Sequence, residues 1–140
     1  MLLVCTVGTT VPEGVLKLQI TRSRPRNDWL WVPQLAPSGE LFEKYRRWYK
    51  AGEWPARARW EEYRARFLEE MEAPQARQWI KAIVEKLLQG KDVAISCFCR
   101  DERYCHRSLV AGLISDRFFE KGGDAERLGW AGYTLRHNGR

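Results

Sequence analysis

Long hydrophobic runs are missing from this sequence of 140 residues. No apolar stretch approaches the ~20 residues that a membrane-spanning helix requires, so the sequence predicts no contact with a membrane. The first residues lack the positively charged segment and the small-residue cleavage site of a secretory signal peptide. Internal repeats and linker-like segments are also missing. These absences predict a single domain over residues 1–140, long enough to bury a core, with a bacterial or archaeal cytoplasm as the default location.

Cysteine is scarce and unevenly placed. Cys5 stands alone, whereas Cys97, Cys99 and Cys105 crowd into one short segment. Four cysteines in a chain of this length do not make the framework of a small disulfide-rich protein. Their crowding favours a reduced site near Cys105, while Cys5 and one of the pair Cys97 and Cys99 are expected to pack in the core as small apolar residues.

Acidic residues are outnumbered, because 24 Lys and Arg face 18 Asp and Glu and the formal net charge is +6. Arginine supplies most of the positive groups, and its planar guanidinium suits bidentate contact with phosphate or carboxylate. The charge therefore favours an anionic partner, whether a nucleotide, a nucleic acid or a small oxyanion. A basic surface with salt bridges along its helices is an equally good interpretation.

Hydrophobic periodicity predicts the order of strands and helices. Short apolar runs predict strands at residues 2–7, 15–21 and 92–99, and apolar residues at helical spacing predict helices at residues 38–52, 55–71 and 74–88. A last helix, marked by apolar residues from 109 to 118, is expected to open at residues 105–107 and to end at Gly122-Gly123. A short strand at residues 133–135 is a weaker prediction. The aromatic residues of the first two helices follow one face and are assigned to the core. Strands separated by helices predict an α/β fold, a single three-layer, Rossmann-like domain with a small, mostly parallel sheet flanked by helices.

The turn from Cys97 to Ser108 is the main candidate site, because ligands of parallel sheets bind beyond the carboxyl ends of the strands. A thiol at a helix N-terminus has a lowered pKa, and an imidazole moves protons near neutral pH. We therefore predict Cys105, expected to be exposed in this polar turn, and His106 as catalytic residues. A guanidinium at this position can clamp an oxyanion. The candidate ligand-binding residues are Cys97, Cys99, Arg107 and Ser108 in the turn, and Arg22, Arg24 and Arg26 after the second strand.

The same turn also supports metal or redox chemistry. Cys97, Cys99, Cys105 and His106 offer three thiols and an imidazole, a legitimate zinc set. Against zinc, Cys97 and Cys99 lie one residue apart rather than two, and adjacent Cys105 and His106 are expected to point in different directions. A disulfide between Cys99 and Cys105 would instead make the protein redox-responsive. No cofactor other than zinc is expected.

Two further interpretations were weighed. The basic balance together with exposed aromatic residues would suit a nucleic-acid-binding module. The spacing from Cys97 to Arg103 matches the minimum of a cysteine phosphatase loop, but the intervening residues contain two carboxylates and no glycine, so that assignment is discounted. The sequence leaves the oligomeric state open.

The sequence also resembles a known family. The residues that carry the resemblance are the strand 93–97 followed by Cys105-His106-Arg107, the loop Arg24-Pro25-Arg26 with Trp29, and the segments 5–8, 35–41 and 60–67. They are similar to the hallmarks of the uncharacterised proteins called domain of unknown function family 488, and Cys99 departs from that pattern. The resemblance implies an α/β three-layer domain and supports the location of the site, although it implies no particular reaction. The preferred function is binding of a small anionic, phosphate- or nucleotide-like ligand at the Cys-His-Arg turn.

Overall fold

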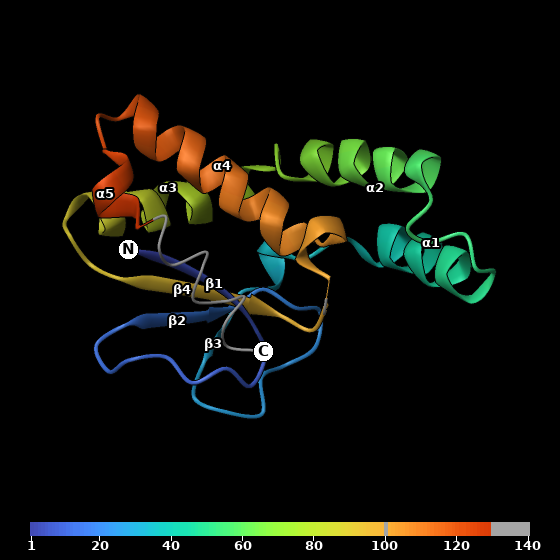
Figure 1. Ribbon diagram of the computed structural model, residues 1–140, viewed down its shortest axis with the longest axis horizontal. Helices are drawn as coiled ribbons and strands as arrows, with labels where there is room; N and C mark the ends of the chain where they lie inside the picture. The colour runs from blue at the N-terminus through green and yellow to red at the C-terminus, as the bar shows by residue number, and fades with distance from the viewer. Residues whose placement is uncertain (100, 130–140) are drawn as a thin grey trace.

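The computed structural model describes residues 1–99 and 101–129, which form a sheet of four parallel strands and five α-helices (Figure 1). The elements in chain order are β1 (Leu2–Thr6), β2 (Leu16–Gln19), β3 (Leu30–Trp31), η1 (Pro33–Leu35), α1 (Gly39–Lys50), α2 (Arg57–Glu70), α3 (Pro74–Leu88), β4 (Val93–Cys97), η2 (Glu102–Tyr104), α4 (His106–Glu120) and α5 (Ala125–Leu128). The strand order is β1-β4-β2-β3. The predicted α/β class and its parallel sheet are confirmed.

The two faces of the sheet are covered by different kinds of structure. Alternate residues of the strands, such as Val4 and Ile95, belong to the main core that the helices complete (Figure 1). The intervening residues, such as Cys5 and Ala94, face a smaller cluster to which the loop residues Val15 and Trp29 contribute. All five residues of β4 are buried, as expected for a central strand covered on both sides. Within the described residues, the helices thus cover one face and loop segments cover the other.

Helices α1 and α2 extend past the carboxyl edge of the sheet, and this placement creates a space beyond the strand ends (Figure 1). The predicted N-cap Ser38 is confirmed, because its side chain accepts a hydrogen bond from the Leu41 N–H at 3.2 Å. Glu70 of α2 accepts the Ser38 N–H at 2.8 Å, which ties the end of α2 to the start of α1. Aromatic side chains fill the space between the two helices, with Tyr45 and Trp54 packed edge to face at 5.0 Å.

The element boundaries differ from the predictions in a few places. Helix α3 has its predicted bounds, whereas α2 begins at Arg57, so Pro55 precedes the helix instead of lying in its first turn. Helix α4 begins at His106 with Cys105 as its N-cap, in agreement with the prediction that Cys105, His106 and Arg107 open this helix. The strand predicted at residues 133–135 lies outside the described residues. None of the described helices is long and apolar enough to cross a membrane.

Candidate functional site

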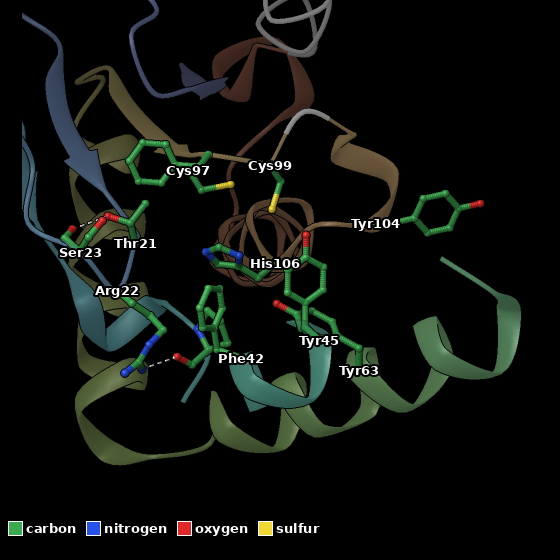
Figure 2. A pocket seen from close by; sticks show the side chains of 12 residues that line it. Thr21, Arg22, Ser23, Phe42, Tyr45, Tyr63, Cys97, Cys99, Tyr104 and His106 are labelled. Atoms are coloured by element: carbon green, nitrogen blue, oxygen red, sulfur yellow. Dashed lines mark hydrogen bonds between the residues drawn. The ribbon is translucent and has the colours of Figure 1, made fainter. Parts of the chain in front are cut away.

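The end of β4 and the start of α4 bring the cysteines of the turn together. Cys97 is the last residue of β4, and Cys105 is the N-cap of α4. Because β4 points toward the N-terminus of α4, the turn between them places the two sulfur atoms 2.9 Å apart. This separation is longer than the ~2.05 Å of a disulfide bond, and all four cysteines are free thiols. Figure 2 shows Cys97, Cys99 and His106 gathered where α4 begins.

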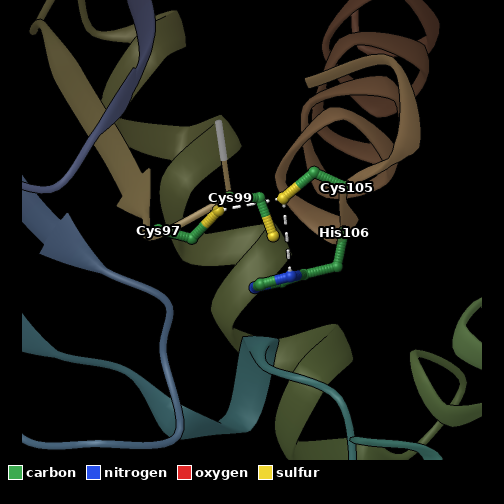
Figure 3. Close-up of side chains that lie close together, drawn as sticks. All are labelled: Cys97, Cys99, Cys105 and His106. Carbon is green, nitrogen blue, oxygen red and sulfur yellow. Dashed lines mark hydrogen bonds between the residues drawn. The ribbon is translucent and has the colours of Figure 1, made fainter. Parts of the chain in front are cut away.

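Four potential metal ligands converge in this turn (Figure 3). The sulfur atoms of Cys97, Cys99 and Cys105 and a ring nitrogen of His106 all lie within 4.8 Å of one another. The expectation that Cys105 and His106 would point apart is wrong. Cys105 has an extended backbone (φ −136°, ψ 146°), whereas His106 is helical, so the change of conformation between them turns both side chains to the same side. The Cys105 sulfur lies 3.8 Å from His106 Nδ1.

A backbone carbonyl from another strand orients His106. Its Nε2 lies 2.6 Å from the carbonyl oxygen of Ile20, the residue that follows β2. Because a carbonyl only accepts hydrogen bonds, Nε2 carries the proton and donates it. In the neutral imidazole the lone pair is then on Nδ1, the nitrogen that lies 3.8 Å from the Cys105 sulfur. A histidine that binds a metal commonly donates its other ring N–H to a carbonyl or carboxylate oxygen in this way.

Arg107 points into the protein instead of toward solvent. Its Nη1 donates to the Cys97 sulfur at 3.2 Å and also to the carbonyl oxygen of Cys99. The side chain is only 3% exposed. Arg107 is not part of the pocket lining and its Nη1 is engaged with the cluster, so its predicted contact with an oxyanion stays a prediction. Its guanidinium supplies a positive charge beside Cys97.

The three thiols of the cluster have different pKa values. Burial would raise the pKa of Cys97, but hydrogen bonds from Cys105 and Cys99, and the neighbouring His106 and Arg107, hold it well below its usual value. The hydrogen bond with Cys105 lowers the pKa of Cys99, but the one with Cys97 and burial outweigh it and raise that pKa to about 12. Burial, followed by hydrogen bonds to the other two thiols, raises the pKa of Cys105. Of the three thiols, Cys97 is therefore the one whose thiolate the surroundings favour most.

The prediction for Cys105 as an exposed thiol of lowered pKa is wrong in both respects. Its side chain is 1% exposed, because it packs in the main core instead of lying at the surface. The position at the helix N-terminus does not lower its pKa, because burial and the hydrogen bonds with Cys97 and Cys99 raise it. Cys99 is the half-buried member of the cluster, and Cys5 is buried on the other face of the sheet, as predicted for it.

A pocket of about 210 Å³ opens beside the cluster (Figure 2). Its lining comes from the loop after β2, from α1 and α2, and from the turn before α4: Thr21, Arg22, Ser23, Pro37, Phe42, Tyr45, Tyr63, Cys97, Phe98, Cys99, Tyr104 and His106. No carboxylate occurs among these lining residues. A second hollow of about 370 Å³ shares Tyr45, Phe98, Cys99 and Tyr104 with the first and extends to Trp54. The cluster therefore lies at one wall of an aromatic groove.

Only one of the three arginines predicted after β2 reaches this pocket. Arg22 lines it, donates to the carbonyl oxygen of Pro37 at 3.0 Å and lies 5.9 Å from the centre of the Phe42 ring. Arg24 stacks on Trp31 at 5.1 Å, and Arg26 is exposed, so neither is part of the lining.

Ser108 is also outside the pocket lining. Its hydroxyl donates to the carbonyl oxygen of Cys105 at 2.7 Å and serves the first turn of α4. The structure thus brings together Cys97, Cys99, Cys105 and His106, and Arg107 contacts Cys97. The hydrogen bond of the Ser108 hydroxyl lies within the first turn of α4.

Sequence reasoning missed the aromatic wall of the site. Tyr45 and Tyr63 belong to stripes at helical spacing, which were assigned to the core, and both line the pocket. Phe98 was read as part of a buried strand but is 61% exposed at the pocket. The available signal was the position of Phe98 between two cysteines. The hydrogen-bond acceptor of His106 is the main-chain oxygen of Ile20, and the sequence does not show it because every residue has a carbonyl oxygen.

Comparison with known proteins identifies one family. Residues 3–118 match the family model DUF488-N3a, described as the active DUF488-N3 subclade. No curated protein and no solved structure matches the chain. The matched residues contain the cluster, all residues of the pocket lining and the three arginines after β2.

Proposed function

This chain belongs to the DUF488 family, and from that premise we propose that it binds Zn²⁺ through Cys97, Cys99, Cys105 and His106 beside a pocket for a small ligand. The observation that carries the proposal is the convergence of three sulfur atoms and an imidazole nitrogen within 4.8 Å. Thiolate and imidazole are the ligands that zinc prefers in proteins, and Cys₃His is an established ligand set for a tetrahedral site.

The distances support a site that needs only small side-chain movements. Zinc binds sulfur at about 2.3 Å and nitrogen at about 2.0 Å, so neighbouring ligands of a tetrahedron stand roughly 3.5–3.8 Å apart. The 3.8 Å from Cys105 Sγ to His106 Nδ1 agrees with this value. The sulfur atoms of Cys97 and Cys105, at 2.9 Å, have to separate by roughly an ångström, which a small rotation of either side chain achieves.

The surroundings of the cluster also support a metal. The Ile20 carbonyl holds His106 with Nδ1 free for coordination. A zinc ion with three thiolates carries a net charge of −1, and buried Arg107 supplies the opposing charge at Cys97. Cys97, Cys105 and His106 are buried, whereas Cys99 is half-buried in the pocket wall. Cys99 is thus the most exposed of the four proposed ligands, and Cys97 and His106 line the pocket with it.

Metal analysis of the purified, reduced protein tests the proposal. We expect close to one zinc ion per chain in the native protein and loss of the metal in Cys105→Ser. Cys5→Ser is the matched control, because Cys5 is also a buried thiol but lies on the other face of the sheet, and it should keep the metal. Cobalt added to the metal-free protein should give sulfur-to-cobalt charge-transfer absorption. Absence of both zinc and cobalt binding in the folded, reduced protein would refute the proposal.

A dithiol function is a second candidate, favoured by the 2.9 Å between the sulfur atoms of Cys97 and Cys105. In this function a Cys97–Cys105 disulfide forms, and two electrons and two protons pass to an oxidant of the peroxide or disulfide class. The pair differs from Cys99–Cys105, the disulfide that the sequence suggested. Mass spectrometry after oxidation should show the loss of two hydrogens in Cys99→Ser and none in Cys97→Ser. Zinc should protect the native protein from this reaction.

A further inference from the structure

We propose that the pocket beside the cluster binds a nucleotide, with the planar base among its aromatic side chains and the phosphate at Arg22. The proposal deepens the function proposed above, because it names the ligand class of the same site. It rests on the lining of the pocket, the exposure of Phe98 and the distribution of charge around the opening.

The apolar lining of the pocket is almost entirely aromatic. Phe42 and Tyr45 come from α1, Tyr63 from α2, and Phe98 and Tyr104 from the turn before α4. Apart from Pro37 and the two cysteines, no other apolar side chain contributes among the described lining residues, and leucine, isoleucine and valine are not among them. Aromatic faces stack on flat π-systems, whereas an aliphatic chain would be as well served by the branched residues that fill the core. The lining therefore selects a planar ring.

Phe98 provides a ring that is exposed at the mouth of this pocket. It is 61% exposed although it directly follows the buried strand β4, and it forms part of the wall of both adjoining hollows. Cys97 and Cys99 on either side of it are fixed in the cluster, so the backbone that carries the ring is held in place. An aromatic side chain anchored in this way offers a stacking surface to a molecule that enters from solvent.

The charge at the pocket indicates the other half of the ligand. Among the described lining residues of this pocket, Arg22 is the one Lys or Arg side chain and no Asp or Glu occurs. The carboxylate of Asp101 lines the adjoining hollow, where it pairs with Arg103. The hydrogen bond of Arg22 to Pro37 and its contact with the Phe42 ring fix the guanidinium at the rim. Among the described residues, neither Arg22 nor its neighbours Arg24 and Arg26 form an ion pair. Guanidinium groups without a carboxylate partner suit phosphate, and a ring with phosphate attached is a nucleotide.

Calorimetric titration of the native protein with the four ribonucleoside monophosphates tests this assignment. We expect at least one monophosphate to bind at least tenfold more tightly than its nucleoside and than inorganic phosphate. Phe98→Ala should weaken binding at least tenfold, and Arg22→Gln should remove the advantage of the monophosphate over the nucleoside. Both residues are exposed, so the variants should fold. Phe119→Ala and Arg64→Gln, which change exposed residues away from the pocket, should bind as the native protein does.

A second titration, with single-stranded oligonucleotides, distinguishes a free nucleotide from a nucleotide within a nucleic acid strand. Tighter binding of the oligonucleotide, with a log–log salt dependence that becomes shallower in Arg24→Gln, assigns the base to a nucleic acid strand. Equal or weaker binding of the oligonucleotide assigns it to a free nucleotide, and both results support the proposal. Failure of every monophosphate and oligonucleotide to bind, or binding that Phe98→Ala and Arg22→Gln leave unchanged, overturns it. Zinc content measured on the same samples separates this failure from a failure of the metal site.

Discussion

Replacement of Arg107 by methionine should weaken zinc binding at the cluster by 10- to 100-fold. The guanidinium Nη1 lies 3.2 Å from the Cys97 sulfur, and at an effective dielectric constant of about 20 two unit charges at that separation attract by about 5 kcal/mol. Burial of the guanidinium offsets a large part of this attraction. Loss of a residue that hydrogen-bonds to a metal ligand typically weakens metal binding 10- to 100-fold, or by about 1.4–2.8 kcal/mol. A loss of this size agrees with the attraction that is left after the cost of burying the guanidinium.

Competition of the protein with a chromophoric zinc chelator measures this change directly. Arg107→Lys should give an intermediate affinity, because it keeps the charge but loses the planar fork that reaches both Cys97 and the carbonyl of Cys99. Arg103→Met is the control, since Arg103 lies in the same turn but is exposed and pairs with Asp101. A folded Arg107→Met variant with unchanged zinc affinity would refute the reasoning, because Cys97 would then not depend on the charge beside it.

Three further predictions concern stability. The pKa of Cys5 is raised from 9.0 to about 11, chiefly by burial, so the folded state holds this proton more tightly and the unfolding free energy should fall by about 2–3 kcal/mol as the pH rises from 9 to 11. In urea unfolding, Cys5→Ala should lack this decrease in unfolding free energy. The prediction would be contradicted if the variant and the native protein showed the same dependence of unfolding free energy on pH. In Gly123→Ala the new methyl group would meet the ring of fully buried Phe118, so thermal unfolding should show a loss of about 1–3 kcal/mol, whereas an unchanged midpoint would show that the ring moves freely. Ser38→Ala removes the side-chain acceptor of the Leu41 N–H and should cost about 1 kcal/mol in chemical denaturation, with Ser38→Asn close to the native value.

The fold was predictable where one local rule decides the structure. Helix α3 has its predicted bounds because Pro74 suits the first turn and Gly90, at a φ of +83°, follows the C-terminus. Residues 93–97 read as a buried strand because they are short, apolar and bounded by polar residues. The start of α4 agrees with the prediction that Cys105, His106 and Arg107 open this helix, but the apolar pattern did not show that His106 and Arg107 are buried.

The site was predictable in position but not in geometry. The turn from Cys97 to Ser108 follows a strand and precedes a helix, and the general preference of parallel sheets for ligands at that edge located it. The direction of the Cys105 and His106 side chains depends on the extended backbone of one and the helical backbone of the other, which residue types do not reveal. Helical spacing places Tyr45 on a face of α1, but only the position of α1 beyond the sheet edge turns that face toward a pocket.

The cluster and the opposite wall of the pocket come from different segments of the chain, so each can change in evolution without the other. The four cluster residues and the buried Arg107 all fall within residues 97–107, so one short segment of the sequence encodes all five side chains. Most of the opposite wall is inherited elsewhere, in the loop after β2 and in helices α1 and α2. Substitution of Phe42 or Tyr63 can therefore change which molecule fits the pocket and leave the four cluster residues in place.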